Sequence, residues 1–272
     1  MHITITGNLG SGKSTICKIL EDKYGFEIYS TGKVQRQLAR EMNMTTLEMN
    51  QLMCSDPKYD TMIDDTTARI SRENRDKNII FDSRLAWHFV EQSFKVFLSV
   101  SLDVAAERVM NDNRGKEERY SSLNEAKEML AKRAATEDKR YRDMYQLNYF
   151  DFSNYNLVID STYNTPETIA SIILEEAKNF EEAMKKKDDF PPGNQGINRI
   201  LLSPKRLYKK PISKEEALAL SPITEKYKKM NNFIDTVIPV SKTGDEYTVL
   251  KEEDKVKAAL LADVPFLQVK IS

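Results

Sequence analysis

The stretch Gly7-Asn8-Leu9-Gly10-Ser11-Gly12-Lys13-Ser14 decides the fold, because it fits the phosphate-loop pattern G-x-x-x-x-G-K-[ST]. The β-branched run His2 to Thr6 precedes it, which suits a buried strand. A helical pattern follows, with Ile16, Ile19 and Leu20 on one face. The glycines let successive N–H groups converge on an anion, and the helix adds its positive N-terminal end. This order predicts a site for nucleotide phosphates.

The loop predicts both a nucleotide and a metal. Lys13 should reach the β- and γ-phosphates of ATP, and the Ser14 hydroxyl should ligate Mg²⁺. Asp82 ends the strand run Ile79 to Phe81, where a carboxylate would orient Mg²⁺ or its waters. An ordinary cap or turn aspartate is the alternative for Asp82. The residues predicted to hold ATP in the loop are Gly7, Gly10, Ser11, Gly12, Lys13, Ser14 and Thr15.

Strands alternate with helices over residues 1–184, which predicts an α/β fold with a parallel sheet and helices on both faces. Further strands are expected at 26–29, 78–81, 95–100 and 156–160. Helices are expected at 31–42, 46–54, 57–73, 102–110, 123–141 and 165–184. Residues 185–197 are charged and then rich in Pro and Gly, which predicts a linker.

Residues 198–272 are expected to form a small second α/β unit. Its predicted strands are 199–202, 237–240, 246–250 and 266–271, and its predicted helix is 251–261. This part counts fourteen basic against ten acidic residues, which is mildly basic and spread out. A regulatory or docking role is the preferred interpretation, and a stabilising appendage is the alternative.

The composition of the chain argues against several classes of protein. Forty-one basic residues nearly balance forty-two acidic ones, which argues against a chain-wide nucleic-acid or membrane footprint. Two cysteines, Cys17 and Cys54, belong to no metal-spaced set and are expected to be buried in a reducing cytosol. No signal peptide and no membrane span are expected, so we predict a cytoplasmic protein; nothing in the sequence specifies an oligomeric state.

Arginines are grouped where a kinase would need to hold several phosphates together. Arg133, Glu137 and Arg140 are spaced at i, i+4 and i+7, so they share one helix face. Such a set is also typical of a solvated salt-bridge stripe. The alternative is a recognition face in which a carboxylate accepts from the cytosine N4 amino group. The other arginines singled out are Arg36, Arg84, Arg108 and Arg114.

At these residues the chain resembles cytidylate kinase, most closely the archaeal-type and related cytidylate-kinase-like proteins, over about residues 1–180. The resemblance rests on the loop, on Ser30-Thr31-Gly32 with Arg36, and on Asp82-Ser83-Arg84. It continues in Ala106-Glu107-Arg108 and in the spacing from Arg133 to Tyr141. Ser83 departs from the glycine usual between the acid and the arginine.

The resemblance implies transfer of a phosphoryl group from ATP to CMP or dCMP. Ser30, Arg36 and Arg84 would contact CMP, Arg133 and Glu137 would read cytosine, and Arg140 would bridge the phosphates. Arg108 would lie under the ATP adenine or in the lid, which the helices around residues 114–140 would form. Lys13, Arg84 and Arg140 are the predicted catalytic residues.

Residues 200–271 faintly resemble the ParB/sulfiredoxin-type small domain, in Ile238-Pro239-Val240 and Gly244 to Val249. That family's nucleotide loop is replaced here by Lys251-Glu252-Glu253-Asp254-Lys255, so its catalytic site is not expected.

Two alternatives to a cytidylate kinase remain. The first is a P-loop kinase with another acceptor, such as AMP, UMP or another small molecule. The second is a nucleotide-sensing or nucleic-acid-associated module that binds without turnover. Retention of Lys13, Ser14, Asp82 and the arginines argues against the second.

Overall fold

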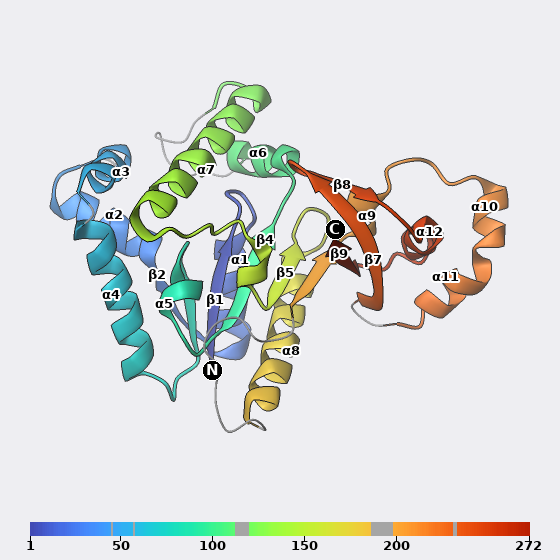
Figure 1. Ribbon diagram of the computed structural model, residues 1–272, viewed down its shortest axis with the longest axis horizontal. Helices are drawn as coiled ribbons and strands as arrows, with labels where there is room; N and C mark the ends of the chain where they lie inside the picture. The colour runs from blue at the N-terminus through green and yellow to red at the C-terminus, as the bar shows by residue number, and fades with distance from the viewer. Residues whose placement is uncertain (45, 57, 112–119, 186–197, 231–232) are drawn as a thin grey trace.

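The computed structural model describes residues 1–272 except 45, 57, 112–119, 186–197 and 231–232. Its strands form one nine-stranded sheet in the order β2-β3-β1-β4-β5-β6-β9-β7-β8 (Figure 1). From β2 to β6 all neighbouring strands are parallel. Strand β9 is antiparallel to β6 and parallel to β7. Strands β7 and β8 form an antiparallel pair. The strands are β1 (His2–Gly7), β2 (Glu27–Ser30), β3 (Ile79–Asp82), β4 (Phe94–Ser99), β5 (Leu157–Asp160), β6 (Arg199–Leu202), β7 (Phe233–Thr243), β8 (Glu246–Val249) and β9 (Phe266–Ile271).

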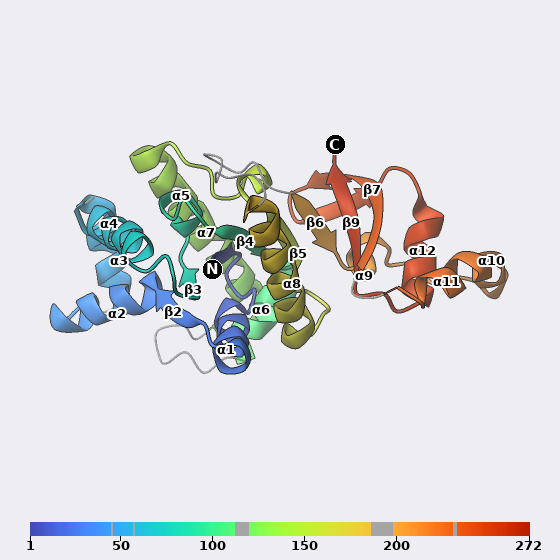
Figure 2. The ribbon, with the colours of Figure 1, turned by 90° about the horizontal axis from the view of Figure 1, so that it is seen from below.

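Helices cover both faces of the parallel part, because its strands are buried on both sides. Residues of β1, β4 and β5 that point to one face pack on α1 (Lys13–Tyr24) and α8 (Pro166–Lys185), which lie side by side (Figure 2). Phe97 and Val158 point to the opposite face and pack on side chains of α5 (Ala86–Phe89) and α7 (Leu123–Tyr145). The short helix η2 (Phe152–Asn154) precedes β5.

The phosphate loop lies at the point where the strand order reverses. Strand β1 pairs with β3 on one side and with β4 on the other. Ligands of open α/β sheets bind at such a switch point, outside the carboxyl ends of the strands. One end of this edge is flanked by three helices, α2 (Thr31–Glu41), α3 (Thr46–Ser55) and α4 (Lys58–Glu73) (Figure 1). Helices α6 (Leu102–Asn111) and α7 both lie above the edge in the same view. Of the residues predicted to form a lid, 114–140, the structure describes those from 120 onward, most of which belong to α7; Arg114 lies outside the described residues, and the lid stays a prediction.

The C-terminal unit, residues 198–272, continues the sheet of the first part. Strand β6 pairs in parallel with β5, and its Leu201 packs in the same core as β1 and α8. A second core lies between β6–β9 and the helices α9 (Pro204–Leu207), α11 (Ser221–Tyr227) and α12 (Glu253–Leu261). The helix α10 (Lys214–Ala219) precedes α11. The linker lies almost wholly outside the described residues, and the division at residues 184 and 198 stays a prediction.

The α/β fold class predicted from sequence is confirmed, and the five predicted strands of the first part appear within about two residues of their expected bounds. Strand β7 is longer than predicted, and α5, α9, α10 and α11 were not predicted. The part of the chain that the structure describes contains no helix with the length and apolarity needed to span a membrane.

Candidate active site

Two glycines of the phosphate loop are required by close contacts. A Cβ atom on Gly7, whose φ is +152°, would collide with the Leu98 carbonyl oxygen of β4. A Cβ atom on Gly10, with φ +75°, would stand 2.8 Å from the Ala105 carbonyl oxygen of α6. The loop is therefore fitted between β4 and α6, and it can come this close to both only without side chains at these positions.

The phosphate loop leads directly into the N-terminus of α1. Gly12 is the N-cap in a left-handed conformation, and as a glycine it supplies no side-chain capping bond. The first turn contains no acidic residue, and the Ser14 and Thr15 side chains are exposed. Ser11, by contrast, is buried. A helix end of this kind offers backbone N–H groups and positive potential to an anion.

Lys13 stands among the charges of two other parts of the fold, the end of β3 and helix α7. Burial and the neighbouring Arg84 guanidinium lower the pKa of Lys13 to about 8, while Asp82 and Glu137 act in the opposite direction. The loop, the end of β3 and helix α7 therefore converge electrostatically on one ammonium group. A phosphate entering here would meet a group whose charge it stabilises.

Asp82 ends β3, beside Ile5 of β1 in the strand register. One of its carboxylate oxygens accepts a hydrogen bond from the Ser30 hydroxyl at 3.1 Å, and Ser30 is the register partner of Asp82 on β2. Ser30 is buried, so this bond fixes the carboxylate at the edge of the sheet. The structure thus joins a predicted metal ligand to a predicted substrate contact.

Arg84 forms the central ion pair of the site. Its Nε–H donates to Glu137 of α7 at 2.8 Å, and its Nη1–H donates to the Gly7 carbonyl at 2.8 Å. The side chains of Arg84 and Glu137 are only 16% and 15% exposed. The other Glu137 oxygen accepts from Arg133 Nε at 3.1 Å. Glu137 of the predicted helix face therefore points into the site, whereas Arg133, whose side chain is 43% exposed, lies at its solvent edge.

The electrostatics of this trio favour ionised groups. Burial acts to raise the pKa of Glu137, but Arg84 and Arg133 outweigh it and lower that pKa to about 2. Burial opposes the charge of Arg84, yet Glu137 and other neighbours raise its pKa above the ordinary value. Both side chains stay charged at neutral pH, which preserves a fixed guanidinium beside the loop.

Arg140 makes its contacts with a different helix. Its Nε lies 3.7 Å from an Asp60 carboxylate oxygen on α4, and its guanidinium donates to the Tyr141 hydroxyl at 3.1 Å. Arg140 is therefore held toward α4. Sequence reasoning missed Asp60 and its neighbour Asp64, both buried. Their i, i+4 spacing on the core face of an amphipathic helix was a readable signal.

The two remaining predicted arginines lie on opposite sides of the site. Arg36 is exposed on α2, with its guanidinium above Gly32 and near Ser30. Arg108 of α6 donates to the Gly10 carbonyl at 3.3 Å and to the Ser161 carbonyl at 2.6 Å. Burial lowers the pKa of Arg108, and Asp160 acts in the opposite direction. Arg108 thus binds the phosphate loop to the end of β5.

A phosphate loop that faces a buried arginine–glutamate pair across the end of a parallel sheet defines a P-loop kinase. The chain belongs to the cytidylate kinase-like family, whose model matches residues 2–163. The match ends before the C-terminal unit.

Individual relatives agree with this family. A cytidylate kinase of Methanocella arvoryzae is 33% identical over 183 residues, which cover 67% of this chain and 100% of that protein. A cytidylate kinase of Methanococcoides burtonii is 35% identical over 162 residues, covering 60% of this chain and 88% of that protein. A crystal structure of an uncharacterized protein from Eubacterium ventriosum has a TM-score of 0.50, with 15% identity, 65% of this chain and 98% of that chain covered. This last similarity concerns the fold alone.

Proposed function

We propose that the chain transfers the γ-phosphoryl group of ATP to the phosphate of CMP or dCMP. The observation that carries this proposal is the position of Arg84, which binds the Gly7 carbonyl and Glu137 at 2.8 Å each. One guanidinium thereby lies between the loop for ATP and the helix face proposed to recognise the acceptor. The family of the chain supports the same reaction.

Phosphoryl transfer needs close positioning of two anions. A phosphate oxygen of CMP attacks the γ-phosphorus of ATP, a new P–O bond forms, the bond to the β-phosphate oxygen breaks, and ADP leaves. The acceptor is already an anion, so no general base is required. Positioning and charge neutralisation supply the catalysis. In this proposal Lys13, Arg84 and Arg140 neutralise the phosphates, and Arg36 with Ser30 binds the acceptor phosphate.

Mg²⁺ would be held by Asp82 and Ser14 together with phosphate oxygens. Carboxylate and hydroxyl oxygens are the hard donors that this ion prefers, and it commonly keeps few protein ligands. The Asp82 carboxylate is oriented by Ser30, and the Ser14 side chain is exposed at the start of α1. When bound, the ion would screen the charge of the phosphates. Lys13 and Arg84 orient those phosphates from the protein side.

The helix face of α7 is our candidate for base selection. Arg133 and Glu137 would read cytosine, with the carboxylate accepting from the N4 amino group. Both Glu137 oxygens already accept from arginines, so the amino group would join or replace one of these bonds. A uracil carbonyl in the same place would meet an acceptor that cannot donate.

The direct test is a coupled ADP-release assay with ATP-Mg²⁺ and CMP, dCMP, UMP, AMP or GMP in parallel. Lys13→Ala is the blank, because it removes the ammonium from the phosphate loop. Strong turnover of CMP or dCMP that the blank abolishes is the expected result. Preference for a different nucleotide, or no turnover while ATP still binds, would contradict the proposed acceptor.

For the C-terminal unit we propose a regulatory or docking role, as its ParB/sulfiredoxin-like sequence features suggest. Its α/β arrangement of β6 to β9 with α12 is compatible with that resemblance. Lys251 and the acidic residues after it occupy the place of that family's nucleotide loop, so this role would not include catalysis. Deleting residues 198–272 would not separate regulation from folding, because it also removes β6 from the sheet; single substitutions within the unit separate the two.

A further inference from the structure

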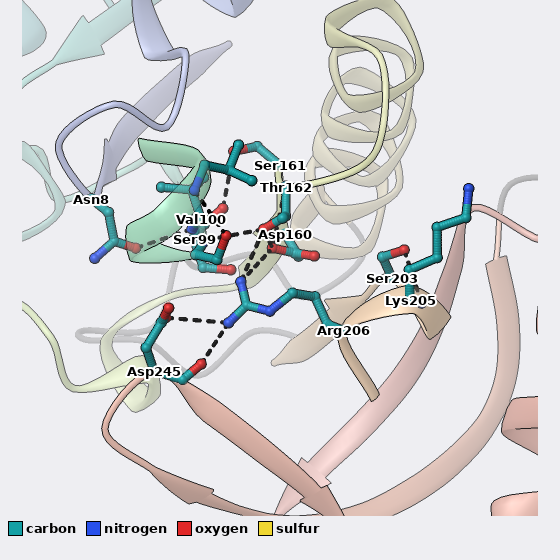
Figure 3. A network of polar contacts seen from close by, with 12 residues as sticks. Asn8, Ser99, Val100, Asp160, Ser161, Thr162, Ser203, Lys205, Arg206 and Asp245 are labelled. Atoms are coloured by element: carbon teal, nitrogen blue, oxygen red, sulfur yellow. Dashed lines mark hydrogen bonds and ion pairs between the residues drawn. The ribbon is translucent and has the colours of Figure 1, made fainter. Parts of the chain in front are cut away.

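A buried polar network links the C-terminal unit to the carboxyl edge of the sheet (Figure 3). Asp160, at the end of β5, is fully buried and lies 3.3 Å from a guanidinium nitrogen of Arg206 on α9. The same nitrogen donates to the Thr162 hydroxyl at 2.9 Å. Arg206 is itself 5% exposed, so this ion pair is taken out of water. Such a pair fixes the relative position of the two elements that supply it.

The network continues to the turn between β7 and β8. The other terminal nitrogen of Arg206 donates to the Asp245 backbone carbonyl at 2.6 Å and to its carboxylate at 3.2 Å. The remaining Asp245 carboxylate oxygen accepts from the Leu102 N–H at 2.8 Å. Leu102 is the first residue of α6, a helix of the kinase-like part. A side chain of the C-terminal unit therefore occupies the N-terminus of α6.

This contact adds to the capping of α6. The Ser101 hydroxyl accepts from the Val104 N–H at 3.3 Å, which satisfies one of the free donors of the first turn. The Asp245 carboxylate satisfies another, and its negative charge interacts favourably with the helix dipole. Arg206 holds that carboxylate in place. The end of α6 is thus fixed by a residue 143 positions later in the chain.

Helix α6 in turn is the support of the phosphate loop. Its Ala105 backbone is so close to Gly10 that a single Cβ atom there would be 2.8 Å away. Arg108, two turns into the same helix, donates to the Gly10 carbonyl. Leu9 of the loop packs on a cluster that includes Ala105 and Val109. Displacing α6 would therefore displace the loop, because two closely packed segments cannot move independently of each other.

From these contacts we infer that Asp245 is a positioning residue for ATP: by capping α6, the C-terminal unit sets the geometry of the phosphate loop. The inference rests on the proposed function only in taking ATP as the ligand of that loop. The CMP side of the site, where Ser30 and Arg36 lie, belongs to β2 and α2, and its Ser30 hydroxyl bonds to Asp82 rather than to this network. Loss of the cap should consequently affect ATP more than CMP.

Asp245→Ala tests this inference by equilibrium binding of ATP-Mg²⁺ to the full chain, which needs no acceptor turnover. Removing the cap acceptor should weaken ATP binding by roughly 3- to 10-fold, the range expected for one lost helix cap. Binding of CMP should change less than twofold. Asp245→Asn keeps an oxygen for the Leu102 N–H, so it should recover most of the ATP affinity.

Glu246→Gln is the matched control, since Glu246 follows Asp245 as the first residue of β8 and its side chain forms an exposed ion pair with Lys209. It should bind ATP like the unmodified chain. The inference is overturned if Asp245→Ala binds ATP normally, or if it weakens ATP and CMP equally together with a lower melting temperature. Failure of CMP turnover would leave this ATP-binding test unaffected.

A measurement on the unmodified chain keeps the inference testable even where Asp245→Ala does not fold. Coupling between two sites is reciprocal, so ATP-Mg²⁺ should also stabilise the contact between Asp245 and α6. We expect ATP to slow amide hydrogen exchange in peptides covering residues 100–111 and 241–247. Unchanged exchange in residues 241–247 at saturating ATP would overturn the inference.

Discussion

The Nε–H of Arg84 donates to Glu137 at 2.8 Å, and the two residues are 53 positions apart in the chain. This bond connects the end of β3 with the middle of α7, and the second bond of Arg84 reaches the phosphate loop. The planar guanidinium can make both bonds at once because its donors point in fixed directions.

Arg84→Lys should lower kcat/KM about 10- to 100-fold, which is the effect of losing about 1.5–3 kcal/mol of a charged hydrogen bond. A single ammonium keeps the charge but cannot bind Gly7 and Glu137 in the same geometry. Steady-state kinetics with CMP measure the change. Arg69→Lys, on an exposed i, i+4 pair with Glu73, is the control. Activity of Arg84→Lys within twofold of the unmodified chain would contradict the role given to Arg84.

Glu137→Gln should reduce the preference for CMP over UMP by about 1–3 kcal/mol, the scale of one good base contact. The amide can donate as well as accept, so it no longer discriminates against the uracil carbonyl. The measurement is the ratio of kcat/KM for the two nucleotides. If Glu137 only positions Arg84, turnover of both acceptors would fall together and the ratio would not change.

The affinity for ATP should decrease as the pH rises above about 8, the pKa to which burial and Arg84 lower that of Lys13. Bound phosphate favours the charged lysine, so binding is strongest below this pKa and weakens by at most tenfold per pH unit above it. ATP titrations between pH 6.5 and 9.5 test this. Lys13→Met should bind weakly with a flatter profile, and a profile in the unmodified chain that matches this variant would contradict the prediction.

Asp64→Asn should stabilise the chain at pH 8. Burial raises the pKa of Asp64 to about 7, against the opposing effect of its Tyr145 hydrogen bond. A carboxyl whose pKa is raised by folding binds its proton more tightly in the folded state. It therefore costs stability as the pH rises from about 4 to about 7.

The expected gain of this variant is about 1–3 kcal/mol in the free energy of unfolding at pH 8, and clearly less at pH 5. Urea unfolding at the two pH values measures it. Asp65→Asn, at the exposed neighbouring position on α4, should show little change at either pH. A gain for Asp64→Asn that does not grow with pH would contradict the raised pKa.

The elements that could be predicted from sequence are those with a local signal. The phosphate loop is contiguous in sequence, and β1 and α1 on either side of it have strong strand and helix patterns. The strand–loop–helix unit could therefore be predicted directly from the sequence. Helix α10, which was not predicted, has an equally local signal in the capping box of Ser213 and Glu216. The predicted strand 237–240 covers only part of β7, because the N-terminal half of β7 lacks a simple alternation of apolar residues.

The pairings across the site could not be predicted in the same way. The spacing of Arg133, Glu137 and Arg140 gave a common helix face, but not that Glu137 pairs with Arg84 while Arg140 turns to Asp60. Which neighbour each side chain meets depends on how α7 packs against β3 and α4. The pairing of Asp160 with Arg206 depends likewise on how two distant parts of the sheet meet.

The pairing of β5 with β6 has a consequence for any shortened version of this protein. Leu157 to Ile159 form their outer ladder with Arg199 to Leu201, and β9 continues the sheet beyond it. Cutting the chain after α8 would leave β5 as an unprotected edge strand, with free backbone donors and acceptors open to a second molecule. Self-association of that fragment would then come from strand addition rather than from any failure of the phosphate loop.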